Sequence, residues 1–258
     1  MANFGFARLA VVAPYEAHWR EAKSAVGASD LLQNAKSAKA LAEAVANCTL
    51  VVGTGSLEHR KPEQPVIPLP ELAPLIQNEL ARAGRIALIF GSEKRGLTQE
   101  DLAHCHVLVV IPADPSQPSM NLGQAVAVCL YELASRTGPL AGDLGAPGPG
   151  SPRTGLSPRG GDPSHLGTWE HPSHDDPPAS ARDLDLLASV VEQTMLAANY
   201  SPAAMRKANR HDLNLLLRRL ALTRRDTSRV LGFFRRVLWR LKHNPSPGAR
   251  GKPDGTGK

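Results

Sequence analysis

The stretch RIALIFGSEKRGLT, residues 85–98, joins an apolar run directly to a loop that lies between two glycines. The run at 86–90 has the composition of a strand that is buried on both faces of a sheet. Gly91 and Gly96 then let the chain turn tightly, and Thr98, before three polar residues, predicts the N-cap of a short helix. A strand, a loop and a helix in succession are the repeating unit of a parallel α/β fold.

The same alternation of apolar runs and helical patterns extends on both sides of this stretch. Strands are predicted at 9–12, 49–52, 86–90 and 107–111. Helical periodicity predicts helices at 31–46, 72–82 and 124–134. Residues 1–135 are therefore expected to form one α/β domain, in which a parallel sheet is flanked by helices.

Glycine and proline dominate the segment 136–180, with nine of each in 45 residues. Such a segment has too little apolar surface to offset the entropy of an ordered chain, so a disordered linker is expected there. Beyond it, helical periodicity predicts a small all-α extension at 181–243, with helices at 182–198, 210–220 and 224–242. The tail at 244–258 is again rich in Pro, Gly and Lys and is expected to be loose.

Positive charge is concentrated in the C-terminal part of the chain. The formal net charge of the whole chain is +6, yet residues 179–243 alone contain thirteen Lys or Arg against five Asp or Glu. In the predicted helix 224–242, one stripe of apolar residues at helical spacing is expected to pack in a core. Another face carries four residues that are candidates to bind the phosphates of a polyanion: Arg225, Arg229, Arg236 and Arg240. A solvated helix face without a partner is the competing interpretation.

Cysteine usage and hydropathy favour a protein of the reducing cytoplasm. Cys48, Cys105 and Cys129 lie far apart, which argues against both a disulfide framework and a Cys-x-x-Cys metal site. His104-Cys105-His106 offers metal-ligand chemistry, but neighbours on a strand point to opposite faces and no second cluster completes four ligands, so no metal is expected. No apolar stretch approaches the roughly 18 residues of a membrane span, and the first residues lack the pattern of a signal peptide.

Three loops follow predicted strands, at 53–56, 91–97 and 112–121, and all three are expected to open at one edge of the sheet. In parallel α/β folds, ligands bind outside the carboxyl ends of the strands. Glycines there let main-chain amides approach a ligand closely, and the third loop runs into the N-terminus of a helix. Such a pocket suits a nucleoside-containing ligand, although an ordinary turn explains each glycine motif at least as often.

These loops also resemble those of a known family. The matching motifs are Phe90 to Thr98, Cys105-His106, Ile111-Pro112, Ser119-Met120-Asn121-Leu122 and Tyr131-Glu132. They closely resemble motifs two and three of the SPOUT-class (SpoU-like) RNA 2′-O-ribose methyltransferases, and most of all the TrmJ group of tRNA methyltransferases. The resemblance covers nearly all of residues 1–135, and it is looser at Arg218-Arg219-Leu220 and around Gly232.

The resemblance implies S-adenosyl-L-methionine as the cofactor, and a homodimer in which each active site borrows residues from the partner subunit. It also implies that the C-terminal part of the α/β domain forms a trefoil knot, a rare exception to the rule against threaded loops. Transferred position by position, the cofactor would be lined by Thr54, Gly55, Ser56, Gly91, Ile111, Ser119 and Met120. The reaction centre would be organised by Glu93, Ser119 and Asn121. A second interpretation of Glu93 is a loop anchor that binds main chain.

The implied reaction is 2′-O-methylation of a ribose in tRNA, with a pyrimidine at position 32 of the anticodon loop as the expected nucleotide. The basic helical extension favours tRNA as the substrate. The alternatives are a ribosomal-RNA ribose methyltransferase on the same scaffold and a non-catalytic RNA-binding protein.

One part of the family pattern is expected upstream of the given sequence. In the relatives, the arginine assigned to proton removal precedes residues like Met1-Ala2-Asn3-Phe4-Gly5, and the first β-strand lies upstream of it. The given sequence starts inside this pattern, so neither the arginine nor that strand is part of it. Because motifs two and three are intact, we expect the recorded start to be an internal methionine; the alternative is the non-catalytic protein.

Overall fold

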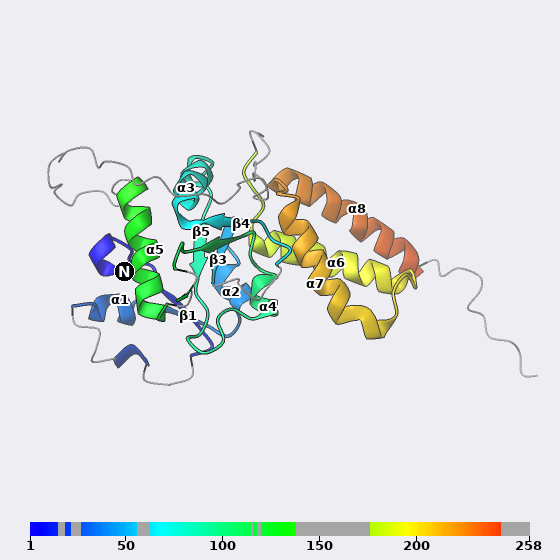
Figure 1. Ribbon diagram of the computed structural model, residues 1–258. Helices are drawn as coiled ribbons and strands as arrows, with labels where there is room; N and C mark the ends of the chain where they lie inside the picture. The colour runs from blue at the N-terminus through cyan, green and yellow to red at the C-terminus, as the bar shows by residue number, and fades with distance from the viewer. Residues whose placement is uncertain are drawn as a thin grey trace, which may run out of the picture.

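The computed structural model describes residues 1–14, 19–21, 27–55, 62–114, 116–117, 120–137 and 176–243. An α/β part holds the strands, and a group of three long helices from the C-terminal region lies beside it (Figure 1). Most of the predicted linker and the whole predicted tail, 244–258, lie outside the described residues. No helix in the described part of the chain is long and apolar enough to cross a membrane.

Four parallel strands form the main sheet, in the order β4-β6-β3-β5. Their bounds are β3 (Leu50–Thr54), β4 (Val66–Pro68), β5 (Ile86–Ile89) and β6 (Val107–Val110). Two further strands, β1 (Ala10–Val12) and β2 (Lys36–Ala38), pair in parallel as a separate sheet. The four predicted strands and the parallel α/β class are confirmed. The apolar patterns did not predict β2 and β4, each of which is only three residues long.

Short and long helices connect and cover these strands. The α/β part contains α1 (Ser29–Gln33), α2 (Leu41–Val45), α3 (Leu72–Ala81), α4 (Gln99–Leu102) and α5 (Leu122–Thr137), with 3-10 turns at Ala2–Phe4, Trp19–Glu21 and Leu69–Glu71. The C-terminal part contains α6 (Ala181–Ala197), α7 (Arg206–Arg219) and α8 (Arg224–His243), with a 3-10 turn at Ala203–Met205. The predicted helices over 72–82, 124–134 and the C-terminal region are thus confirmed, although α7 begins four residues before the predicted start.

The predicted single helix at 31–46 is wrong. The structure has α1, then β2, then α2 in this region. The amide of Lys36 donates to the carbonyl of Leu9 at 2.9 Å, and the amide of Ala13 donates to the carbonyl of Ala38 at 2.9 Å. These bonds give β2 a partner strand. Helix propensity is a weak preference, and here the pairing of β2 with β1 overrides it.

The strand β3 lies at the centre of the core and is buried on both faces. Alternate side chains of a strand point to opposite faces, and Leu50 and Val52 accordingly pack with Leu72 and Leu133, from α3 and α5. Val51 packs on the other face with Val45 of α2, Leu102 of α4 and Leu108 of β6. Figure 1 shows α5 on one side of the strands and α2, α4 and α6 on the other. Full burial of each such side chain contributes about 1.5–3 kcal/mol to folding.

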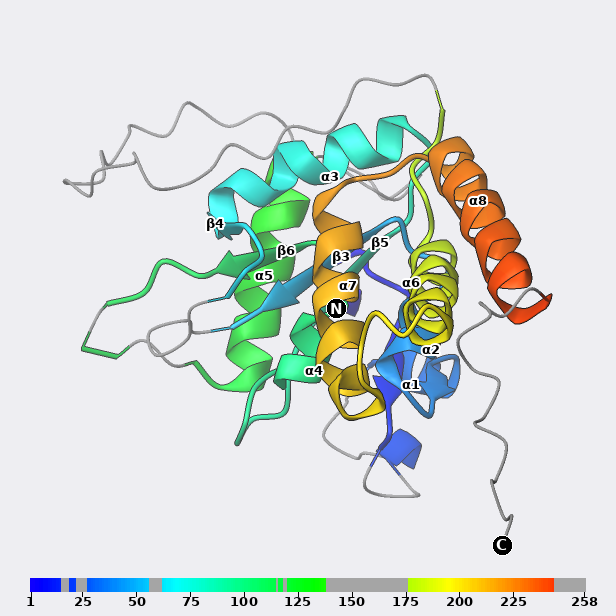
Figure 2. The ribbon, with the colours of Figure 1, turned by 90° about the vertical axis from the view of Figure 1, so that its right-hand side faces the viewer.

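The three C-terminal helices form their own small core and also dock on the α/β part. Leu184, Leu187 and Leu217 are buried together, with Val230 and Phe234 of α8 packed against them. At the start of α6, the amides of residues 181 and 182 donate to the carbonyls of residues 48 and 46, at 2.8 and 3.0 Å. Main-chain hydrogen bonds therefore attach the start of α6 to the segment between α2 and β3. Figure 2 shows α7 and α6 in front of the strands and α8 outermost.

Gly232 lies in the middle of α8, where a glycine destabilises a helix by about 1 kcal/mol relative to alanine. The predicted apolar stripe of this helix, which includes Val230 and Phe234, faces α6, and the predicted arginine face is exposed. At the start of the same helix Thr223 acts as an N-cap, because the amide of Asp226 donates to Thr223 Oγ1 at 3.1 Å.

Candidate active site

The predicted cofactor loops meet at one edge of the main sheet. The strands β6, β3 and β5 are adjacent and parallel, so their carboxyl ends lie side by side. Thr54 and Gly55 end β3, Gly91 follows β5 and Ile111 follows β6. The hydroxyl of Thr54 donates to the carbonyl of Ile89 at 2.9 Å and so ties the end of β3 to that of β5. Two predicted cofactor residues, Ser56 and Ser119, lie outside the described residues.

Gly91 is required by the packing of its own loop. A Cβ atom at this position would lie 2.0 Å from the carbonyl carbon of Gly96 and 2.2 Å from the amide nitrogen of Leu97. Gly96 has a φ of +64°, a conformation that other residues rarely adopt, and its amide donates to Ser92 O at 2.8 Å. The loop therefore closes on itself, and Leu97 anchors it in the core. Its exposed tip presents Glu93 to solvent.

Glu93 and Asn121 come together although 28 residues separate them. Asn121 Nδ2 donates to Glu93 Oε1 at 3.0 Å. Asn121 Oδ1 accepts from the amide of Gly123 at 2.8 Å, as the side chain of an N-cap residue does at the start of a helix. This bond fixes the amide so that its nitrogen faces the carboxylate. Glu93 thus links the loop after β5 to the start of α5 through a side-chain hydrogen bond, and both of its predicted roles, at the reaction centre and as a loop anchor bound to main chain, stay predictions.

The surroundings of this pair combine main-chain groups with apolar side chains. Met120 is 40% exposed, and Ile111 is half-buried at the end of β6. A Cβ atom at Gly55 would have no heavy atom within 4 Å, so the backbone there is open to a ligand. Open backbone beside apolar surface suits a flat base with a polar edge. The described residues therefore fit an adenosine-containing cofactor.

Asp114 is a polar feature of this edge that the sequence patterns missed. Its carboxylate accepts hydrogen bonds from the hydroxyl of Ser116 at 2.6 Å and from the amide of Ser116 at 2.8 Å. These two bonds lower the pKa of Asp114, so the group stays charged in mildly acidic solution. The sequence Asp-Pro-Ser at 114–116 is typical of a turn, and it could have indicated this feature. The side chain is exposed and shapes the loop after β6.

The His104-Cys105-His106 motif serves packing at the junction with the helices. His106 Nδ1 accepts from the amide of Val51 at 3.1 Å, and His104 contacts Arg218 of α7. Burial raises the pKa of the Cys105 thiol to about 12, which keeps it protonated. In the described part of the chain, no group of three or more His, Cys, Asp or Glu side chains is placed to hold a metal ion.

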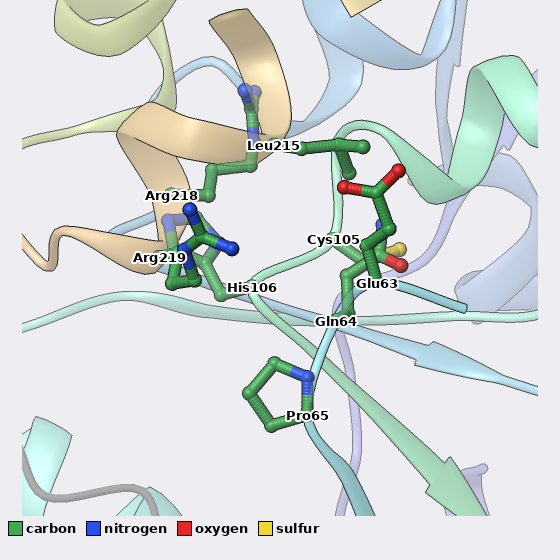
Figure 3. A pocket seen from close by; sticks show the side chains of 8 residues that line it. All are labelled: Glu63, Gln64, Pro65, Cys105, His106, Leu215, Arg218 and Arg219. Atoms are coloured by element: carbon green, nitrogen blue, oxygen red, sulfur yellow. The ribbon is translucent and has the colours of Figure 1, made fainter. Parts of the chain in front are cut away.

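Arg218 is the central residue of this junction. It is 1% exposed, and its guanidinium donates to the carbonyl of His104 at 3.0 Å and to Asp185 Oδ1 at 3.0 Å. Figure 3 shows a small crevice beside it, where Arg218 and Arg219 from α7 approach the segment that carries Cys105 and His106. Its volume of about 10 Å³ is at the lower limit for one water molecule. The crevice therefore belongs to the packing of α7 on the α/β part.

The predicted RNA-binding arginines lie far along the chain from the loops but share one surface. Arg225, Arg229, Arg236 and Arg240 are all exposed on α8. The apolar stripe of α8 packs on α6, and α8 is the outermost of the three C-terminal helices in Figure 2. The structure confirms that these four arginines are exposed on α8, and their binding to RNA stays a prediction.

The fold and the loop edge define a SPOUT-like α/β protein with a basic helical region. Residues 1–131 match the profile of a family described as the SpoU rRNA Methylase family. The match covers half of the chain, and the chain belongs to this family.

Two tRNA methyltransferases are similar to this chain, over different lengths. The tRNA (cytidine/uridine/adenosine-2'-O-)-methyltransferase TrmJ of Pseudomonas aeruginosa (strain UCBPP-PA14) is 38% identical over 134 residues, which are 52% of each chain. The chain thus spans about half the length of this relative. The tRNA (cytidine/uridine-2'-O-)-methyltransferase TrmJ of Pectobacterium atrosepticum is 29% identical over 246 residues, 92% of this chain and 86% of that one.

A solved structure is similar over the α/β and helical parts together. The crystal structure of TrmJ from Z. mobilis ZM4 aligns with a TM-score of 0.69 and 24% identity, over 92% of this chain and 89% of that chain. The likeness confirms the fold, including the presence of the helical region after the α/β part.

Proposed function

We propose that this protein is a tRNA 2′-O-methyltransferase that uses S-adenosyl-L-methionine. The observation that carries the proposal is the hydrogen bond between Asn121 and Glu93, which joins two loops at the carboxyl edge of the sheet. Ligands of parallel α/β folds bind at this edge. Membership of the SpoU rRNA Methylase family and the names of the relatives support the same activity.

The cofactor, when bound, supplies an activated methyl group. Four of the described residues would hold it. Gly55 offers open backbone, Ile111 and Met120 offer apolar surface, and Thr54 offers a hydroxyl that a hydrogen bond holds in place. Gly91 would contribute the close turn that shapes the loop. Ser56 and Ser119 remain predictions for this site, because they lie outside the described residues.

The ribose hydroxyl must be held in line with the methyl group, at about 3 Å, and must lose a proton. Asn121 has a second amide hydrogen and Glu93 retains free lone pairs, so the pair keeps one donor and one acceptor for a sugar. We assign both to positioning the ribose.

The substrate is proposed to be tRNA, with a pyrimidine at position 32 as the modified nucleotide. The names of both relatives include cytidine and uridine in tRNA, and that of the Pseudomonas protein also includes adenosine. The exposed arginines of α8 offer a surface for the RNA backbone. We also propose a homodimer in which each site is completed by the partner subunit. A trefoil knot in the loop region remains a prediction from the resemblance.

Ribosomal RNA is the second candidate substrate, because the family that matches residues 1–131 is described as an rRNA methylase family. Both substrates require the same chemistry at the loops. They differ in which RNA the helical part recognises. The non-catalytic RNA-binding protein is the third outcome that the following experiment distinguishes.

Asn121→Ala is expected to lower kcat/KM for methyl transfer roughly 100-fold, because the ribose and Glu93 lose their positioning partner. The assay measures transfer from labelled S-adenosylmethionine to a tRNA transcript and, in parallel, to a ribosomal RNA fragment. Gln99→Ala, at an exposed amide on α4, is the matched control and should retain full activity.

The outcomes separate the three candidates. Transfer to the ribosomal fragment and not to tRNA would replace the proposed substrate. If calorimetry detects no binding of S-adenosylmethionine to the unmodified protein, the non-catalytic interpretation is correct. Unchanged turnover in Asn121→Ala would remove this residue from the site.

A further inference from the structure

Gly232 has no structural reason to be a glycine within this chain. It lies in the interior of α8, and its φ is not among the positive values that favour glycine. A Cβ atom added there would meet no heavy atom within 4 Å. Gly91, in contrast, is surrounded by backbone atoms that exclude a side chain. Because glycine destabilises a helix interior, an alanine at 232 would make a more stable protein.

The surroundings of Gly232 are cationic. On a helix, the neighbours of a residue lie three and four positions away, and for Gly232 these are Ser228, Arg229, Arg235 and Arg236. All four are exposed. We call these four residues and Gly232 the α8 notch. Within the part of the chain that the structure describes, none of its arginines forms an ion pair with a carboxylate.

We propose that the sugar–phosphate backbone of the RNA substrate seats in the α8 notch, against the main chain at Gly232. This inference rests on the proposed function, since it takes the substrate to be RNA. Without a side chain at 232, a phosphate can approach the helix surface closely enough for guanidinium groups on both sides to reach it. One guanidinium group can bind two oxygens of a phosphate at once, because its N–H donors lie in one plane.

Two exposed aromatic side chains lie on α8 close to the notch, one beside Gly232 in the sequence and one about two turns further along. Phe233 is 65% exposed and Trp239 is 57% exposed. Trp239 stacks on His243 with ring centroids 4.6 Å apart, which holds its indole at the surface. Aromatic faces beside a cationic track are typical of surfaces that bind unpaired nucleotides, because bases stack on them. The notch is therefore placed for RNA with exposed bases, such as a loop.

Charge argues against a second copy of the chain as the occupant. In a symmetric contact, the same surface of both copies would meet, and Arg229, Arg235 and Arg236 would face their own equivalents. Like charges at such short range are unfavourable. The buried side of α8 is already occupied by α6, so the notch remains available for a polyanion.

The test uses the full chain with Gly232→Ala and Gly232→Leu, and it measures tRNA affinity by fluorescence anisotropy across a range of salt concentrations. Gly232→Ala should raise the Tm by about 2 °C, because helix propensity improves. It should nevertheless weaken binding about threefold, and Gly232→Leu roughly tenfold, since the added atoms hold the backbone away. Gln193→Leu, on the exposed side of α6, is the control for an added surface leucine and should leave affinity unchanged.

The variant Arg236→Glu distinguishes a failure of the notch inference from a failure of the proposed function. It should weaken binding and reduce the slope of log affinity against log salt by about 1 or more. If Arg236→Glu loses affinity while Gly232→Leu binds as tightly as the unmodified protein, RNA binds α8 but does not enter the notch, and this inference is wrong. If the unmodified protein neither binds nor methylates tRNA, the proposed function itself fails. A change of oligomeric state in Gly232→Leu, seen by sedimentation, would make the notch a protein contact and would also overturn the inference.

Discussion

At the scale of single residues, Arg218 joins three parts of the chain that are remote in sequence. Its guanidinium binds the carbonyl of His104, the ring of the same histidine and the carboxylate of Asp185. Burial of a charged group is tolerated only when its donors are satisfied, as they are here. Removing the guanidinium would leave the carboxylate and the carbonyl without this donor.

Arg218→Ala is therefore expected to lower the free energy of unfolding by about 3 kcal/mol, because it breaks a buried ionic network. Urea denaturation measures the change. Arg219→Ala is the control, since Arg219 is exposed on the same turn of α7 and its loss should change stability by less than about 0.5 kcal/mol. Equal effects of the two variants would show that the network adds nothing to stability.

His104 gives the junction a pH dependence. Burial lowers its pKa below the ordinary value of 6.5, and the positive charge of Arg218 lowers it further, against smaller opposing effects of Asp185, Asp101 and Glu100. Below pH 6.5 the unfolded chain binds a proton that the folded protein still excludes. The contribution of neutral His104 to the free energy of unfolding should therefore be fully present above pH 6.5. It should decrease as the pH falls toward the lowered pKa of His104 in the folded protein.

The pH prediction is tested by urea unfolding at pH 7.5 and at pH 5.5, for the unmodified protein and for His104→Gln. The variant should lose less stability between the two pH values, because glutamine does not titrate. Asp114 does not interfere, since its pKa lies below the ordinary value of 3.8, outside this range. An equal loss in both proteins would rule out His104 as the source.

At the scale of elements, caps and local pairing set the boundaries. The α4 helix begins with the predicted Thr98 cap, and Asp101 completes a capping box there. The cap of α6 was not predicted, yet Ser180 and Asp183 form the same reciprocal pair. In contrast, the region 31–46 has helix-forming composition but contributes a strand, because β1 supplies main-chain partners.

Ser180→Ala should lower the free energy of unfolding by about 1 kcal/mol, since the first turn of α6 loses its side-chain acceptor. Chemical denaturation of both proteins measures the difference. Ser228→Ala makes the same chemical change at an exposed position inside α8, where no cap is lost, and should be neutral or slightly stabilising. A loss in Ser228→Ala as large as that in Ser180→Ala would contradict the capping argument.

At the scale of the whole molecule, the helical part is docked on the α/β part. The start of α6 bonds to the carbonyls of residues 46 and 48, and Arg218 of α7 bonds to the chain before β6. The sequence suggested a separate extension behind a linker. In the structure, Ala181 instead lies in the same buried cluster as Val51 and Leu108 of the sheet.

We therefore expect the two parts to unfold together. Hydrogen exchange of the amides in β3 and in the middle of α6 should report the same opening free energy, because both would exchange by global unfolding. In Arg218→Ala, exchange in α6 should become faster than exchange in β3. Independent exchange of the two segments in the unmodified protein would show that the docking contacts do not couple them.

The sequence by itself determined the parallel α/β class, four of the six strands, the long helices, the Thr98 helix cap and the exposed arginine face of α8. These features depend on neighbours within a few positions, so composition and periodicity encode them. Only the tertiary structure decided that β2 and β4 are strands, that Asn121 meets Glu93, and that Arg218 reaches His104 across 114 residues. It also distinguished Gly91, which its own loop encloses, from Gly232, where an added Cβ meets no heavy atom of the described residues within 4 Å. Contacts between distant parts of a chain leave no local pattern, because they depend on how the elements pack in space.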